Sequence, residues 1–438
     1  MSIDSFIWDL LVIGLLLLGV TLGSSWITRL PLSFALIYLI AGILLGPYGV
    51  GVIDLQPDAE FLQHLTELVV IVSLFACGIK MNRPLNLWAW NSTVRLLGLL
   101  MPLTIGAVAV LGHFALGLNW GAAILLGAIL APTDPVLASE VQLSHTDDIN
   151  ELRFGLTSEG GLNDALAFPF VYFGLYWLTK DSNWQTWFKS WVAIDLIWAI
   201  LAGLAGGVIV ARVINRLITH FRKLNGIERE VEDLIALATI LLTYSLTELV
   251  NGYGFLAVFV AGVFVRRSRS VDKEYKHSQL HFIGLLEQLL EVGTILLLGA
   301  LLRIDPMLAY LGPSLLVAIL LIFVIRPVAT WISTIGDNLR PATRLLFGWF
   351  GIRGVGSLYY LFYAISSGIT PEVAAPLSWI SFFTITFSML VHGTSATPLM
   401  NWYEKRFGAE NRLEPETLEA ELAAADGEIE REDGEVGG

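Results

Sequence analysis

Two carboxylates and an amide lie within an apolar stretch of the chain, in the sequence LTSEGGLNDALAFPF at 156–170. Glu159 and Asn163 are four residues apart, so on a helix they share one face. Asp164 follows about 140° around the helix from Glu159, so the two carboxylates need not face each other. An acidic group at membrane depth costs at least ~2.5 kcal/mol and marks a functional site by default. This stretch therefore predicts an ion or proton site.

A buried carboxyl group can bind a proton or a cation, but not both. Removal from water favours the neutral, protonated form. Each pH unit changes the free energy of proton binding by ~1.4 kcal/mol. We expect Arg353 to pair with Glu159, which leaves Asp164 as the carrier. Glu67, in another apolar stretch, is a further candidate for lining the site. Glu287, near the start of a later stretch, is expected to face solvent or a second subunit.

Two other apolar stretches contain helix-breaking residues. One holds PTDP at 132–135, and the other holds GIRGVGS at 351–357. Proline removes a backbone donor and clashes with the preceding turn, and glycine permits unwound backbone at little steric cost. In a membrane such breaks persist only where protein or a wet cavity satisfies the freed backbone groups. Both segments therefore predict discontinuous helices.

The ends of broken helices carry partial charges that side chains can neutralise. Asp134 can neutralise positive ends, and Arg353 can neutralise negative ends. Asp134 is thus expected to be structural at the helix breaks rather than a cation ligand. Thr133 offers a hydroxyl and a backbone carbonyl, which are both suitable oxygen ligands for a hard monovalent cation.

The composition places the chain among membrane proteins. Of its 438 residues, 55% are hydrophobic and 15% are charged, whereas soluble domains carry about 25% charged residues. The single cysteine excludes an intrachain disulfide and a cysteine-based metal site. Apolar stretches of ~20 residues predict an all-α polytopic membrane protein with about thirteen transmembrane helices. We place them at 5–27, 32–50, 61–80, 93–117, 119–142, 151–178, 188–215, 230–250, 253–266, 281–302, 307–326, 341–367 and 371–397.

The two breaks fall in the fifth and twelfth of these spans. An odd offset means that the two helices cross the membrane in opposite directions. Paired interruptions in two inverted repeats point to a substrate site near the midplane of a secondary transporter.

Charge in the connections predicts the orientation. Lys and Arg residues gather on alternate connections, Arg326 among them, and such residues collect on the cytoplasmic side. We therefore place the N-terminus outside and the acidic segment 398–438 inside, as a mobile cytoplasmic tail.

The motifs PTDP, EGGLND at 159–164 and GIRGVGS, in this order, resemble those of the NhaP-type Na⁺/H⁺ antiporters of the monovalent cation:proton antiporter-1 (CPA1) family. The resemblance covers roughly 5–397 and implies the NhaA-like antiporter fold, with two crossed discontinuous helices. It implies a dimerisation scaffold and a six-helix core that includes about 93–178 and 281–397. It also implies a homodimer in the lipid of the plasma (inner) membrane.

The resemblance also implies roles for individual residues. Asp164 would be the shared ion and proton site, and Asn163 and Thr133 would help to form it. Asp134 would support the crossed chains, and Glu159 with Arg353 would be a stabilising pair. Relatives with two adjacent acids at 163–164 tend to be electrogenic. Because this chain has Asn163, the resemblance implies electroneutral exchange.

We predict a secondary transporter that exchanges Na⁺, and also Li⁺, for H⁺ by alternating access, with competition at Asp164. Exchange of K⁺ or Ca²⁺ on the same fold is one alternative, and a gated cation channel is another. We expect no enzyme activity, because the sequence holds no HExxH motif and no embedded hydrolase arrangement. We expect no cofactor and no nucleic-acid partner.

Overall fold

The computed structural model describes most of the membrane-embedded chain. The described residues are 33–51, 53, 58–81, 83–135, 137–138, 141–143, 150–180, 184–224, 229–267 and 273–407, with four isolated positions before residue 20. The side chains of 229–232 and 273–277 are not among them. The first predicted span and the acidic segment 408–438 lie outside the described residues.

Every regular element in the described residues is a helix, which confirms the all-α prediction. The elements are α2 (Phe34–Leu45), α3 (Ala59–Lys80), α4 (Asn91–Arg95), η1 (Leu96–Leu100), α5 (Met101–Leu116), α6 (Trp120–Leu130), α7 (Glu151–Thr179), α8 (Trp184–Ser190), η3 (Trp191–Trp198), α9 (Ala199–Leu224), α10 (Arg229–Glu248), α11 (Gly254–Arg267), α12 (Lys273–Leu301), α13 (Ile304–Ala309), α14 (Leu311–Leu320), η4 (Leu321–Ile325), α15 (Arg326–Ser333), α16 (Pro341–Trp349), α17 (Val355–Ser366) and α18 (Pro371–Phe407).

Polar capping residues set where several of these helices begin. Asp58 accepts a hydrogen bond from the backbone of α3, Asn119 from that of α6, and Asn150 from that of α7. A side-chain oxygen at this position satisfies one of the backbone donors that the first turn leaves unpaired. The three helices thus start where their sequences provide an acceptor before an apolar run.

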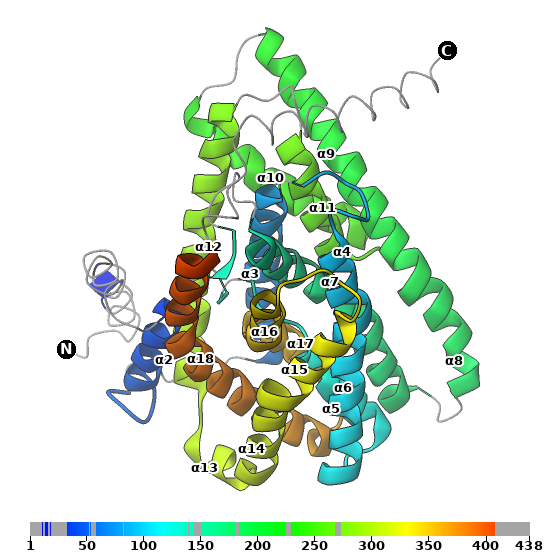
Figure 1. The fold of residues 1–438 in the computed structure, drawn as a ribbon, viewed down its shortest axis with the longest axis vertical. Coiled ribbons are helices and arrows are strands. Elements are labelled where there is room, and N and C mark those ends of the chain that lie inside the picture. Colours follow the sequence, from blue (N-terminus) through cyan, green and yellow to red (C-terminus); the bar gives the residue numbers. More distant parts are fainter. Residues whose placement is uncertain are drawn as a thin grey trace, which may run out of the picture.

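Helix α3 lies near the centre of the molecule, with α9 along one side and α12 along the other (Figure 1). It packs against α11, α12 and α17. A Cβ added at Gly78 of α3 would lie 3.0 Å from the Cα of Gly262 on α11. Small residues let backbones approach closely where lipid offers no hydrophobic drive for helix association. Glycine therefore sets this crossing.

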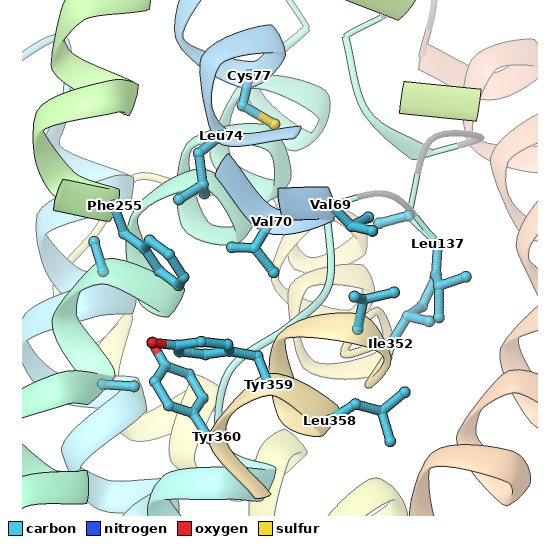
Figure 2. Close-up of a cluster of buried hydrophobic side chains, with 14 of the residues drawn as sticks. Val69, Val70, Leu74, Cys77, Leu137, Phe255, Ile352, Leu358, Tyr359 and Tyr360 are labelled. Carbon is cyan, nitrogen blue, oxygen red and sulfur yellow. The ribbon is translucent and has the colours of Figure 1, made fainter. Parts of the chain in front are cut away.

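Apolar side chains join α3 to the second half of the broken helix. Figure 2 shows Val70 and Leu74 of α3 beside Phe255 of α11, with Tyr359 and Tyr360 of α17 facing them. All five side chains are buried. This contact holds α17 against α3 and so fixes the position of the chain break at its start.

Several boundaries differ from the predicted spans. Helix α18 continues to Phe407, so the first ten residues of the predicted tail are helical. The predicted span 307–326 is instead a short helix, α13, followed by a helix over 311–333 that contains Arg326. Arg326 is buried there, so it does not belong with the inner connections. Several helices are long and apolar enough to cross a membrane, 311–333 among them.

Candidate functional site

Two unwound segments cross inside the protein, which confirms both predicted chain breaks. One follows the end of α6 at Leu130, and the other separates α16 from α17 at 350–354. The backbone N–H of Asp134 donates to the carbonyl oxygen of Ile352 at 2.7 Å. The crossing is buried, so its backbone groups must find partners in the protein.

Asp134 satisfies backbone donors on both segments. One carboxylate oxygen accepts from the N–H of Val355, the first residue of α17, and the other accepts from the N–H of Leu137 at 3.1 Å. A carboxylate at a helix N-terminus opposes the positive end of the helix dipole. A Cβ added at Gly354 would collide with Leu137 Cδ1 and would lie 2.5 Å from Asp134 Oδ2. Glycine is therefore required there for close approach.

Arg353 acts at the opposite helix end. Its Nε donates to the carbonyl oxygen of Leu130, the last residue of α6, at 3.0 Å. Another guanidinium nitrogen donates to the carbonyl of Gly351, and the backbone N–H donates to Ser388 Oγ at 3.1 Å. The cation thus lies where the negative end of the α6 dipole would otherwise be buried without compensation.

Glu159 pairs with Arg326, so the predicted pairing with Arg353 is wrong. The guanidinium of Arg326 donates to both carboxylate oxygens of Glu159, at 2.8 and 3.0 Å. It also donates to the carbonyl oxygen of Phe350 at 2.6 Å. Arg326 lies inside the apolar helix that runs from α14 through η4 into α15, which brings it against α7. Arg353 is committed to backbone carbonyls instead.

Asp164 lies in the middle of α7 and is 1% exposed. Its carboxylate packs on Gly356 in the first turn of α17, where an added Cβ would be 2.7 Å from Cγ. The Tyr360 hydroxyl donates to the backbone carbonyl of Asp164. Neither carboxylate oxygen of Asp164 has a hydrogen-bond partner among the described residues. The carboxylate is therefore held by packing rather than by polar contacts.

Asn163 and Thr133 join this group. Asn163 Nδ2 donates to Thr133 Oγ1 at 2.7 Å, which links α7 to the unwound segment after α6. Asn163 Oδ1 has no hydrogen-bond partner in the part of the chain that the structure describes. Asp134 is close enough to Asp164 for their charges to interact. The structure thus brings the predicted cation ligands together at the crossing.

The whole membrane body matches one family of transporters. Residues 12–402 match the transmembrane family described as sodium/hydrogen exchangers. The chain belongs to the sodium/hydrogen exchanger family. The family transports ions, and this supports the prediction that the chain is not an enzyme.

Named relatives of the exchanger differ in the ion they carry. The K(+)/H(+) antiporter NhaP of Alkalimonas amylolytica is 27% identical over 399 residues, which are 90% of this chain and 66% of that protein. The chain thus spans about two thirds of the length of that relative. The Na(+)/H(+) antiporter 1 of Methanocaldococcus jannaschii is 27% identical over 361 residues, covering 79% of this chain and 81% of that protein.

A solved structure confirms the exchanger fold. The sodium proton antiporter MjNhaP1 from Methanocaldococcus jannaschii at pH 8 superposes with a TM-score of 0.70, at 24% sequence identity. The match covers 90% of this chain and 98% of the other. The predicted antiporter fold is therefore confirmed.

Glu67 lies apart from the crossing. It accepts a hydrogen bond from the Tyr244 hydroxyl of α10, and its other carboxylate oxygen is 3.1 Å from His64 Nδ1. These two contacts lie within α3 and between α3 and α10.

Sequence reasoning missed Arg326, which completes the charge pairing of the exchanger core. A signal for it exists, because Arg326 lies between LLIFVI and VATWI in one apolar run. An arginine within such a run is expensive unless it is paired. The predicted span ended at Arg326, whereas the helix continues to Ser333, with Pro327 just after the π-helical turn η4.

Proposed function

We propose that this exchanger moves Na⁺ and Li⁺ against H⁺, one for one, by alternating access, with both ions competing for Asp164. The observation that carries the proposal is the isolation of the Asp164 carboxylate. It is buried beside the crossed chains, yet neither oxygen has a hydrogen-bond partner among the described residues. A buried charge without a partner is strongly disfavoured. Binding of a proton or a monovalent cation removes that cost.

The other charges at the crossing compensate one another. Glu159 is paired with Arg326, while Asp134 and Arg353 lie at helix ends of opposite sign. These two acids and two arginines sum to zero, so only Asp164 needs a bound ion for neutrality. If the core moves between its two orientations only when its ion site is neutral, Asp164 must carry either the cation or the proton. This supports electroneutral exchange.

The available oxygen atoms suit a monovalent alkali cation. Asp164 supplies a single carboxylate, Asn163 supplies an amide oxygen, and Thr133 supplies a hydroxyl and a carbonyl. Oxygen atoms are the ligands that hard cations prefer, and one carboxylate neutralises one positive charge. We propose Asp134 as the support of the crossing rather than as a ligand.

We propose a moving core of α4–α7 and α14–α18, with α2, α3 and α9–α12 as the scaffold. The sequence-based core began at 281, but α12 packs on α2, α3 and α10, and this favours its place in the scaffold. As in the sequence-based prediction, two copies join through their scaffolds in the plasma (inner) membrane. The N-terminus lies outside, and the C-terminal segment lies in the cytoplasm.

Potassium is the second candidate for the exchanged cation. Several relatives with similar identity carry the name K(+)/H(+) antiporter, and an oxygen-lined site with one carboxylate can hold either ion. Discrimination between the two ions depends on cavity size and on the number of oxygen ligands.

The test is a transport assay in proteoliposomes that contain a pH-sensitive dye. Addition of Na⁺, Li⁺, K⁺ or Ca²⁺ to the outside is expected to move protons for Na⁺ and Li⁺, at a rate independent of an imposed membrane potential. Asp164→Asn, which keeps the side-chain shape, is expected to abolish the signal. Proton movement with K⁺ alone would identify K⁺, rather than Na⁺, as the exchanged cation. Cation current without proton movement would indicate a channel and refute the proposal.

A further inference from the structure

A second carboxylate, half-buried, lies on the scaffold side of the exchanger. Glu287 of α12 accepts a hydrogen bond from Ser73 Oγ of α3 at 2.7 Å. Ser73 is fully buried. The contact turns the carboxylate toward α3, and the side chain stays partly exposed. The exchange described above does not use this group.

The contacts of α3 place Ser73 at the depth of Asp164. A Cβ added at Gly161 of α7 would lie 3.0 Å from the Cβ of Cys77, so these two residues are level. Helices α3 and α7 are three spans apart and cross the membrane in opposite directions. Ser73 lies four residues before Cys77, and Asp164 lies three residues after Gly161. Because the two helices run in opposite directions, both steps lead toward the same side of the membrane, so Ser73 and Asp164 lie at similar depth. The Cys77 thiol is within electrostatic range of both Glu287 and Asp164.

A line of polar groups connects this depth with the end of α3. Ser73, Cys77 and Lys80 are spaced four and three residues apart, so they share one face of α3. Lys80 is close enough to Glu287 for their charges to interact. Across from this face, Gln142 is buried and its Oε1 lies 3.9 Å from Cys77 Sγ. The Gln142 Nε2 has no hydrogen-bond partner among the residues that the structure describes.

The line runs along the boundary between the proposed scaffold and the proposed core. Ser73, Cys77 and Glu287 belong to α3 and α12, whereas Asp164 belongs to α7 and Gln142 follows the crossing. Figure 2 shows Cys77 on α3 beyond Leu74 and Val70, at the end of the apolar cluster that is farther from Tyr360. Ser73, Cys77 and Gln142 are therefore polar or polarisable groups at the boundary between α3 and the core.

We propose that Glu287 forms an auxiliary binding site for a monovalent alkali cation, together with the Ser73 hydroxyl, on the route between the Lys80 end of α3 and Asp164. The inference rests on the proposed exchange function. Glu287 offers a negative charge on the static side of the boundary. Lys80 lies two turns along α3 from Ser73, about 10 Å away, so it offsets this charge only in part, and Glu287 raises the local cation concentration beside Asp164. Ser73 positions the carboxylate and supplies a further oxygen ligand. Cation binding and release at Asp164 thereby become sensitive to a residue outside the core.

Glu287→Gln is the main test, with Glu291→Gln as the matched control. The amide oxygen introduced by Glu287→Gln can still accept the hydrogen bond from Ser73, so the change removes the charge and keeps the contact. Glu291 is one turn further along α12 and lies near Tyr38 of α2 rather than near Ser73. Both variants are compared with wild type in the proteoliposome assay across a range of Na⁺ and K⁺ concentrations.

Loss of the Glu287 charge is expected to raise the cation concentration for half-maximal exchange about tenfold, which corresponds to ~1.4 kcal/mol. The maximal rate is expected to stay within about twofold of wild type, because Asp164 is intact. Ser73→Ala, which leaves the charge but frees the carboxylate, is expected to give a smaller shift in the same direction. The Glu291 variant is expected to match wild type.

A purely structural role for Glu287 predicts a different pattern. It would lower the melting temperature and the maximal rate while the half-maximal cation concentration stays unchanged, and this result would overturn the proposal. If Glu287→Gln does not give folded protein, an unchanged half-maximal concentration in Ser73→Ala overturns it instead. Wild-type protein that shows no cation-dependent proton movement would refute the exchange function itself. Active wild type with an unaffected Glu287 variant would refute only the auxiliary site.

Discussion

The buried pair of Glu159 and Arg326 can be tested by removing its members singly and together. Glu159→Gln keeps the shape of the side chain but leaves the Arg326 guanidinium without a counter-charge in a buried position. Arg326→Met leaves the carboxylate unpaired and also removes the donor to Phe350. In the double variant both charges are gone, while the amide introduced at position 159 and the Phe350 carbonyl both lose their partner.

The magnitudes follow from the contacts. Two charge-assisted hydrogen bonds, at 2.8 and 3.0 Å, are worth ~1.5–3 kcal/mol each. Loss of one partner from a buried pair costs ~3–5 kcal/mol, while apolar replacement of both is often nearly neutral. Each single variant should therefore lose ~3–5 kcal/mol. The double variant should lose ~2 kcal/mol, about 1 kcal/mol each from the unpaired amide at position 159 and the unpaired Phe350 carbonyl. This is far less than the sum of the two single losses, so the two changes are strongly non-additive.

The assay is the apparent melting temperature of purified protein in detergent, followed by the fluorescence of the 14 tryptophans. Large proteins often unfold irreversibly, so all variants are scanned at one heating rate. Both single variants should melt well below wild type, and the double variant should recover most of the difference. Arg353→Met is the control, since Arg353 binds the carbonyl of Leu130 rather than Glu159. Recovery of Glu159→Gln by Arg353→Met, and not by Arg326→Met, would refute the assigned pairing.

Three further predictions concern the crossing. Gly356→Ala should reduce exchange at least tenfold, because the added methyl group overlaps the Asp164 carboxylate. Gly106→Ala is the control and should leave exchange unchanged, because an added Cβ there has nothing within 4 Å. Proton movement in proteoliposomes measures both variants. Asn163→Asp adds a second buried charge beside Asp164, so exchange should become sensitive to an imposed membrane potential, and identical rates with and without the potential would contradict this expectation. Asp134→Asn replaces one carboxylate oxygen by an NH2 group, so the side chain can no longer accept from both backbone donors. This variant should lower stability by ~1–3 kcal/mol. An unchanged melting temperature would count against a capping role.

The spans and the two breaks could be predicted because the membrane restricts the options of the chain. Backbone groups in lipid must be satisfied within helices, so long apolar runs predict helices over nearly the observed ranges. Prolines 132 and 135 and the glycines at 351–356 then predict where those helices stop. Asp164 was identifiable for the same reason, since an acidic residue at such depth needs a function.

The partner of Glu159 could not be predicted from the sequence because pairing depends on how separate helices pack. Arg353 was already within a recognised break, so it was the nearest choice for a counter-charge. Arg326 was assigned to a connection, although the structure continues the helix across it through the wider π-helical turn of η4. Such turns are frequent at functional sites. Which arginine reaches α7 is decided by the rotation of that helix, and no local sequence pattern encodes this rotation.

The exchange of caps between the broken helices bears on how the core could move. Asp134, from the segment after α6, caps the start of α17, and Arg353, from the segment before α17, caps the end of α6. Each helix end is therefore stabilised by the other chain segment, so separating the two segments would expose two buried charges and two helix ends together. The low cost of moving the segments as one unit, compared with separating them, favours a rigid core. Asp164 is attached to that unit through Asn163 and Thr133, so a rigid displacement carries the proposed ion site without breaking any of these contacts.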